Sequence, residues 1–168
     1  MGGPAPTAST IANQANVARM PSFEHVRSTR IAAPPSTVHA LVADLHAWTK
    51  WSPWEGLDAD LKRIYGGAEK GVGARYEWAG KKSGVGSMRI TGVTDDRIDL
   101  DLDFLKPFKA NNRVVFRFEP DGNATRVTWT MSGKRNVVLA VMGKLFFDGM
   151  IGRDFEKGLA RLKAAAEA

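Results

Sequence analysis

Few residues in this chain have both the type and the spacing that catalysis requires. The carboxylates of Asp99, Asp101 and Asp103 stand close together and would suit acid–base chemistry if they faced one another across a cleft. Their period of two instead places all three on one face of a strand, with Leu100 and Leu102 on the other. We therefore predict that these aspartates lie on a solvated sheet surface and carry no catalysis.

Metal and phosphate chemistry find no support in the sequence. Cysteine is absent, and the histidines His25, His39 and His46 lack the spacing of metal ligands. The glycines of 71–73 lead into a predicted strand, whereas a phosphate-binding glycine loop opens a helix. We expect no metal ion and no cofactor.

The periodicity of the chain predicts an α+β domain with a curved antiparallel sheet of about seven strands. The expected strands are 23–31, 60–65, 74–79, 84–93, 97–104, 113–119 and 125–131. Two short helices follow the first strand, at 37–45 and 46–54, and a long helix spans 137–165. Short turns join consecutive strands, which favours antiparallel neighbours.

The chain of 168 residues is long enough for one domain, which we place at 23–168. Residues 1–22, rich in Ala, Pro, Ser and Thr, are expected to form a flexible extension. The first residues lack the basic start and apolar stretch of a secretory signal, and no apolar run is long enough to span a bilayer. We expect a cytoplasmic protein.

One apolar face runs through all the predicted strands, and a single helix must cover it. Strong curvature of such a sheet leaves a space beneath the helix, which predicts an apolar cavity. The predicted lining combines aromatic residues and methionines: Tyr76, Trp78, Met88, Phe104, Phe116, Trp129, Met131, Met142, Phe146 and Met150. The alternative, that these side chains simply fill the space as ordinary core, stays open.

Polar groups that could work inside such a cavity are few. The hydroxyl of Tyr76 shares the apolar face, which makes Tyr76 a weak candidate for catalysis. Arg113, Arg153 and Asp154 are expected near the ends of the space, where they would orient a ligand or form surface ion pairs. The tryptophans of 48–54 line the cavity mouth, contact a membrane or partner, or pack the short helices against the sheet edge.

The net charge of +6 permits contact with nucleic acid or an anionic membrane. Basic residues are scattered among acidic ones, and no nucleic-acid recognition motif is present, so the sequence argues against nucleic-acid binding. Peripheral membrane contact and a macromolecule-binding role remain open.

The sequence resembles a known superfamily. The residues that carry the resemblance are those of 31–38, 48–54, 71–74, 104–108, 127–133 and 157–159. They are similar to the START-like superfamily, also called SRPBCC, and especially to its bacterial polyketide cyclase/dehydrase-like branch. The resemblance covers about 23–166 and implies a helix-grip fold, in which a curved sheet wraps around a long C-terminal helix.

The resemblance also implies a hydrophobic ligand held between the sheet and that helix. A loop at 106–112, with Phe108 as its cap, would then form part of the mouth. We expect a carrier or sensor of a hydrophobic small molecule such as a lipid or a polyketide-like compound, in the form of a monomer or homodimer. The alternatives are a cyclase/dehydratase acting on a polyketide-like substrate and a macromolecule-binding module.

Overall fold

The computed structural model describes residues 22–134 and 137–168, and of 137–148 it describes the backbone path alone. The extension expected at 1–22 therefore lies, but for its last residue, outside the described residues.

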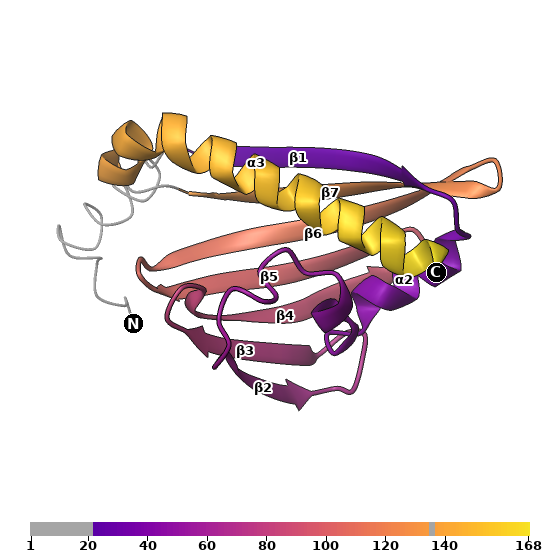
Figure 1. The fold of residues 1–168 in the computed structure, drawn as a ribbon, viewed down its shortest axis with the longest axis horizontal. Helices are drawn as coiled ribbons and strands as arrows, with labels where there is room; N and C mark the ends of the chain where they lie inside the picture. Colours follow the sequence, from indigo (N-terminus) through magenta and orange to yellow (C-terminus); the bar gives the residue numbers. More distant parts are fainter. Residues whose placement is uncertain (1–21, 135–136) are drawn as a thin grey trace, which may run out of the picture.

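All described strands belong to one antiparallel sheet with the order β1-β7-β6-β5-β4-β3-β2 (Figure 1). The strands are β1 (Ser22–Ile31), β2 (Lys62–Gly67), β3 (Ala74–Gly80), β4 (Gly84–Thr94), β5 (Arg97–Lys106), β6 (Ala110–Asp121) and β7 (Ala124–Lys134). From β2 to β7 each strand pairs with the next in sequence, and β1 closes the order beside β7. The predicted meander is confirmed.

Three helical segments complete the fold. Helix α2 (Pro35–Ala43) and the 3-10 turn η1 (Ala47–Lys50) follow β1, and α3 (Val137–Glu167) ends the chain. In Figure 1, α3 lies along β1 and reaches α2 near the C-terminus. The α+β helix-grip architecture expected from the sequence is confirmed. Among the described residues, no helix has both the length and the apolar character needed to cross a bilayer.

Several element boundaries differ from the sequence-based expectation, among them those of β5, β6 and both short helices; the predicted helix at 46–54 is the 3-10 turn Ala47–Lys50 alone. Strands β5 and β6 extend to Lys106 and Ala110, so the loop predicted at 106–112 shrinks to 107–109. The polar residues at the start of β6 gave no strand pattern in the sequence. In the structure, Asn111 donates a hydrogen bond to Asp103 on the neighbouring strand at 2.6 Å. The first helix begins at Pro35, two residues early, because proline fits the first helical position.

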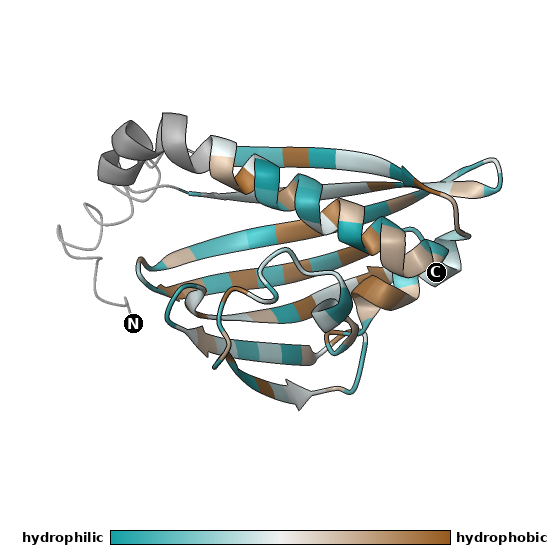
Figure 2. Ribbon diagram, viewed as in Figure 1, coloured by the Kyte–Doolittle hydropathy of each residue, from teal (hydrophilic) through white to brown (hydrophobic). Residues whose placement is uncertain are grey.

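Period-two alternation determines which side chains face inward, and Figure 2 shows it as alternating bands of apolar and polar residues along the strands. Cross-strand pairing aligns one inward-facing position on each strand into a row across the whole sheet. That row consists of Tyr65, Tyr76, Met88, Leu102, Asn112, Gly133 and Phe23.

An aromatic cluster joins the sheet to the helices. Trp129 of β7 stacks on Phe155 of α3, with ring centroids 4.0 Å apart. Trp48 and Trp51, both buried, pack edge-on against Trp129 from the η1 side, and their indole N–H groups donate to carbonyls of α2 at 3.0 Å. These two tryptophans therefore belong to the core, and not to the sheet edge where packing was expected.

Close approach explains two of the glycines in α3. A Cβ atom at Gly158 would meet the Trp129 ring at 2.8 Å and Pro53 at 2.9 Å, and one at Gly152 would collide with the Arg27 guanidinium. Arg27 crosses the helix here and donates a hydrogen bond to Glu156 at 3.0 Å. These glycines permit tight packing of α3, whereas a Cβ at Gly149 would enter open space.

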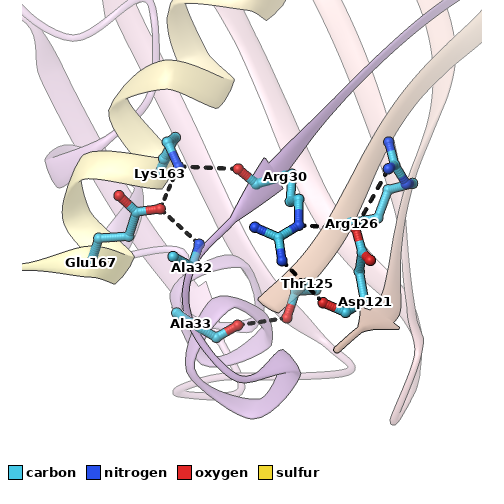
Figure 3. Close-up of polar contacts among 8 residues, drawn as sticks. All are labelled: Arg30, Ala32, Ala33, Asp121, Thr125, Arg126, Lys163 and Glu167. Atoms are coloured by element: carbon cyan, nitrogen blue, oxygen red, sulfur yellow. Dashed lines mark hydrogen bonds and ion pairs between the residues drawn. The ribbon is translucent and has the colours of Figure 1, made fainter. Parts of the chain in front are cut away.

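The C-terminal end of α3 is tied to the end of β1 by polar contacts (Figure 3). Glu167 accepts hydrogen bonds from the Ala32 backbone N–H at 2.7 Å and from Lys163, which also donates to the Arg30 carbonyl at 3.1 Å. The Lys163 ammonium is the main reason that the pKa of Glu167 is lowered. Thr125 donates to the Ala33 carbonyl at 2.7 Å and fixes the same corner.

The outer face of the sheet carries the aspartates of β5, as predicted. Asp99 accepts hydrogen bonds from Arg97 at 2.7 Å and from Arg113 at 2.9 Å, and its side chain is only 13% exposed. The hydrogen bonds from Arg97 are the main reason that the pKa of Asp99 falls from 3.8 to about 2. The hydrogen bond from Arg113 lowers this pKa further. Arg113 thus lies on the outer face, away from the enclosed side of the sheet.

Replacement of Asp99 by asparagine should destabilise the protein in a pH-dependent way. Because folding lowers the pKa of Asp99, its stabilisation is complete above pH 4 and is lost as pH falls toward about 2. We expect Asp99→Asn to lower the free energy of unfolding at pH 7 by about 1 kcal/mol, and the difference from wild type to shrink below pH 4. Urea unfolding followed at several pH values measures this.

Asp101→Asn is the matched control, since the Asp101 carboxylate is half exposed and lies 3.8 Å from Arg89. It should change the unfolding free energy by less than about 0.5 kcal/mol. Equal effects of the two substitutions would contradict the ion-pair account of Asp99.

Candidate functional site

A cavity of about 230 Å³ lies between the inner face of the sheet, the segment 52–61 and helix α3. Strands β3, β4 and β5 provide Tyr76, Trp78, Met88, Leu102 and Phe104. The segment 52–61, the β3–β4 turn and α3 provide the rest: Ser52, Trp54, Glu55, Leu57, Leu61, Lys82, Ser83, Met150 and Asp154. The lining is mainly apolar, with polar groups at its borders.

Aromatic rings form one wall of this cavity. Tyr76 and Trp78 stack with centroids 5.8 Å apart, and Phe104 meets Trp78 edge-on at 5.9 Å. The Trp78 indole N–H donates to the Ser83 carbonyl at 3.2 Å, which fixes the ring. Gly86, paired with Trp78 across the strands, leaves the space over which the indole lies, because a Cβ there would collide with it.

Tyr76 provides a hydroxyl at the edge of the wall, in contact with a charged pair. Arg63 donates hydrogen bonds to both carboxylate oxygens of Glu55. Burial and the negative charge of Glu55 raise the pKa of Tyr76 to about 12, although hydrogen bonding from Arg63 acts in the opposite direction. The Tyr76 hydroxyl is therefore protonated at neutral pH and can donate a hydrogen bond, but it cannot act as a base there.

The segment 52–61 is held in place from two sides. Asp58 accepts hydrogen bonds from the backbone N–H groups of Lys82 at 2.8 Å and Ser83 at 2.7 Å, and from the Ser83 hydroxyl at 2.6 Å. The hydroxyl bond is the largest cause that lowers the pKa of Asp58 to about 2. Arg161 of α3 donates to the Ser52 carbonyl at 2.8 Å. These contacts fix an irregular segment as a cavity wall.

Helix α3 contributes two side chains one helical turn apart, Met150 and Asp154. Met150 is 36% exposed and lies at the border of the cavity. Within the described part of the chain, the Asp154 carboxylate forms no hydrogen bond or ion pair. It is thus a free acceptor beside apolar walls.

The structure gathers part of the predicted lining around this cavity and places the remainder elsewhere. Tyr76, Trp78, Met88, Phe104 and Met150 lie on its walls. The other predicted residues fall into three groups. Buried in the core, outside these walls, are Phe116, Trp129 and Met131, at 0%, 1% and 4% exposure. Phe108 is 49% exposed in the turn 107–109, and the side chains of Met142 and Phe146 lie outside the described residues.

Apart from Trp54, residues of the segment 52–61 were not predicted as lining, because irregular backbone has no periodicity that reveals its buried face. Leu57 and Leu61, two large apolar residues among the acidic and small residues of 55–61, were the available signal. Glu55 was hidden for the same reason. Of the tryptophans in 48–54, Trp54 alone reaches the cavity.

Other polar candidates lie apart from the cavity. Arg153 is exposed on α3. His39 contacts the Thr94 carbonyl at 2.8 Å, and His46 stacks on Tyr65 at 4.0 Å. No group of three or more His, Asp or Glu side chains in 22–134 and 149–168 could hold a metal ion.

Residues 22–167 match the family described as "Polyketide cyclase / dehydrase and lipid transport". Among curated proteins, none matches the sequence significantly.

Several solved structures share the fold at low sequence identity. The protein TTHA0849 from Thermus thermophilus is 16% identical, with a TM-score of 0.65 over 86% of this chain and 97% of its own. MLL2253 from Mesorhizobium loti is 16% identical, with a TM-score of 0.64 over 85% and 96%. The Aha1 dimer from Colwellia psychrerythraea is 16% identical, with a TM-score of 0.61 over 86% and 96%. At this identity the likeness establishes the helix-grip fold alone.

The contact between Gly86 and Trp78 gives a test of the cavity wall. Gly86→Ala should push the indole away from β4, break its hydrogen bond to the Ser83 carbonyl and lower the free energy of unfolding by about 1–3 kcal/mol. The indole N–H signal of Trp78 in a ¹⁵N–¹H NMR spectrum should move, while those of Trp48 and Trp51 stay in place.

Gly149→Ala is the control, since a methyl group there enters open space within a helix. It should stabilise the protein by up to about 1 kcal/mol. An unchanged Trp78 signal in Gly86→Ala would show that the indole does not lie against β4.

Proposed function

Because the chain belongs to the polyketide cyclase/dehydrase and lipid transport family, we propose that it is a carrier or sensor that binds a hydrophobic small molecule. The observation that supports this most is the apolar cavity of about 230 Å³, walled by Tyr76, Trp78 and Phe104. Small-molecule pockets typically occupy about 300–1,000 Å³. We therefore favour a compact ligand, or one with a chain that extends out through the mouth.

Burial of apolar surface would provide most of the affinity, at about 25 cal/mol per Å². Orientation would come from the few polar groups at the borders. Asp154 offers an acceptor without a partner among the described residues, and the Tyr76 hydroxyl offers a donor. A ligand with an apolar body would use a hydroxyl or amine group to donate to Asp154, and a hydroxyl or carbonyl oxygen to accept from Tyr76.

A second candidate function is catalysis of a cyclisation or dehydration on a polyketide-like substrate. The observation that favours it is the neutral Tyr76 hydroxyl beside the Arg63–Glu55 pair at the cavity wall. A donor held there would polarise a substrate carbonyl as negative charge develops on its oxygen. Tyr76 would then act as a hydrogen-bond donor or general acid.

Binding is tested with 1-aminoanthracene, a fluorescent aromatic amine that reports on apolar cavities. We expect wild-type protein to enhance its fluorescence with saturation at one site, and Trp78→Leu to weaken the affinity about tenfold because aromatic contact area is lost. Met131→Leu, a substitution in the core away from the cavity, should leave the affinity within about twofold.

Native mass spectrometry of the purified protein complements this titration, since a retained compound appears as a defined mass increment. Absence of saturable probe binding, in a protein that unfolds cooperatively, would refute the binding proposal.

The two functions are distinguished by Tyr76→Phe. The carrier proposal expects 1-aminoanthracene affinity within about threefold of wild type, because the ring remains. The enzyme proposal expects turnover of a poly-β-ketone substrate by wild type and a loss of at least about a hundredfold in kcat in Tyr76→Phe. Equal turnover by both proteins would eliminate Tyr76 as the catalytic residue.

A further inference from the structure

Two turns lie side by side at the end of the sheet that holds the cavity. They are the β3–β4 turn (81–83) and the β5–β6 turn (107–109), both at the left in Figure 1. Val85 pairs with Lys106 just behind them, and a Cβ at Gly84 would collide with the Lys106 carbonyl. The two turns therefore form one continuous surface.

Large apolar side chains stand exposed on this surface and at the adjoining cavity, which Lys82 and Ser83 of the β3–β4 turn also line. Leu105 and Phe108, at the β5–β6 turn, are 52% and 49% exposed. Leu57 and Met150, on the border of the cavity, are 37% and 36% exposed. These are four of the seven large apolar side chains that stand exposed in the described part of the chain. Exposed apolar groups gathered in one place indicate a surface that contacts a partner or a membrane.

Lysines surround these apolar groups. Lys81 and Lys82 occupy the β3–β4 turn, Lys106 ends β5 and Lys109 lies in the β5–β6 turn; all four are exposed. None forms a side-chain hydrogen bond or ion pair with another residue in the described ranges 22–134 and 149–168. We name Lys81, Lys82, Leu105, Lys106, Phe108 and Lys109 the basic tip.

The acidic residues nearest the basic tip are engaged in other contacts. Asp58 is held by the N–H groups of Lys82 and Ser83, and Asp103 accepts a hydrogen bond from Asn111. On the outer face, by contrast, arginines such as Arg97 and Arg113 are matched by a carboxylate. Four lysine ammonium groups thus face two nearby carboxylates that are held by neutral donors, so the basic tip keeps a net positive charge around an apolar centre.

We propose that the basic tip docks this protein on the surface of an anionic lipid bilayer, with the mouth of the cavity toward the lipid. Phe108 and Leu105 would enter the boundary between head groups and acyl chains, and the four lysines would contact the lipid phosphates. A nucleic acid would use the lysines but would leave the aliphatic side chains of Leu57, Leu105 and Met150 exposed. The surface therefore fits a membrane better.

Docking in this orientation joins the cavity to the membrane. Lys82 belongs both to the basic tip and to the cavity lining, and Leu57 and Met150 lie on the same border. A hydrophobic molecule could pass between bilayer and cavity without crossing water. The docking itself does not depend on the proposed function, because a membrane-bound protein with an unused cavity would still bind vesicles.

Sedimentation with lipid vesicles tests the docking. The full chain should bind vesicles of phosphatidylcholine with about 30 mol% phosphatidylserine much more strongly than pure phosphatidylcholine vesicles, and high salt should release it. The double variant Lys81→Gln/Lys82→Gln should lower the partition coefficient about twenty-five-fold, from a factor of about five per lysine. Phe108→Ala should lower it about tenfold while the salt dependence persists.

The matched control lies at the opposite end of the sheet, where the β2–β3 turn carries exposed Lys70 and Val72, the latter 58% exposed. Lys70→Gln/Val72→Ala removes one positive charge and some exposed apolar surface there, and should leave vesicle binding within about twofold. Thermal unfolding of every variant establishes that the fold is retained.

Three outcomes would overturn the docking proposal. The first is no binding to phosphatidylserine vesicles at low salt, and the second is equal loss in the control and basic-tip variants. The third is tighter binding to a duplex or single-stranded oligonucleotide, with no effect of Phe108→Ala, which would assign the lysines to nucleic acid. Vesicle binding without 1-aminoanthracene binding would retain the docking and reject the cavity function, so the two proposals fail separately.

Discussion

The dimensions of a helix and a sheet impose the constraint on which this site depends. Seven strands spaced about 4.8 Å apart form a surface about 29 Å wide, whereas a helix with its side chains is about 10 Å across. Helix α3 lies along β1, at one side of that surface, and is fixed there by Trp129, Phe155 and the contacts of Lys163 and Glu167. The inner faces of β3, β4 and β5 therefore need a different cover.

That cover is the irregular segment 52–61. Contacts from Asp58 and Arg161 hold the segment as a bridge between the β3–β4 turn and α3. The aromatic rings of Tyr76 and Trp78 line the sheet beneath it. The cavity follows from this geometry: a bridge and a helix meet over a curved sheet, and side chains fill only part of the space between them.

The sequence allowed the fold and the inward faces to be predicted, because period-two alternation specifies side-chain direction directly. It did not specify which part of the inward face the helix would cover. Trp78 and Trp129 carry the same signal, yet Trp129 lies under α3 and η1 and becomes core, while Trp78 lies beyond α3 and lines the cavity. Glu55 and Leu57 lie in irregular backbone, which has no periodicity that reveals its buried face. The expected loop is shorter because β5 ends at Lys106, beyond Phe104, and β6 already begins at Ala110.

The methionines allow the central claim, that the cavity beneath the segment 52–61 is the binding site, to be measured directly. Met88 and Met150 line it, whereas Met131, from the same inward face, is 4% exposed in the core. A titration of ¹³C-methyl-methionine protein with 1-aminoanthracene, followed by NMR, should shift the methyl signals of Met88 and Met150 and leave that of Met131 in place. Saturable shifts at Met131 with none at Met88 and Met150 would contradict the account.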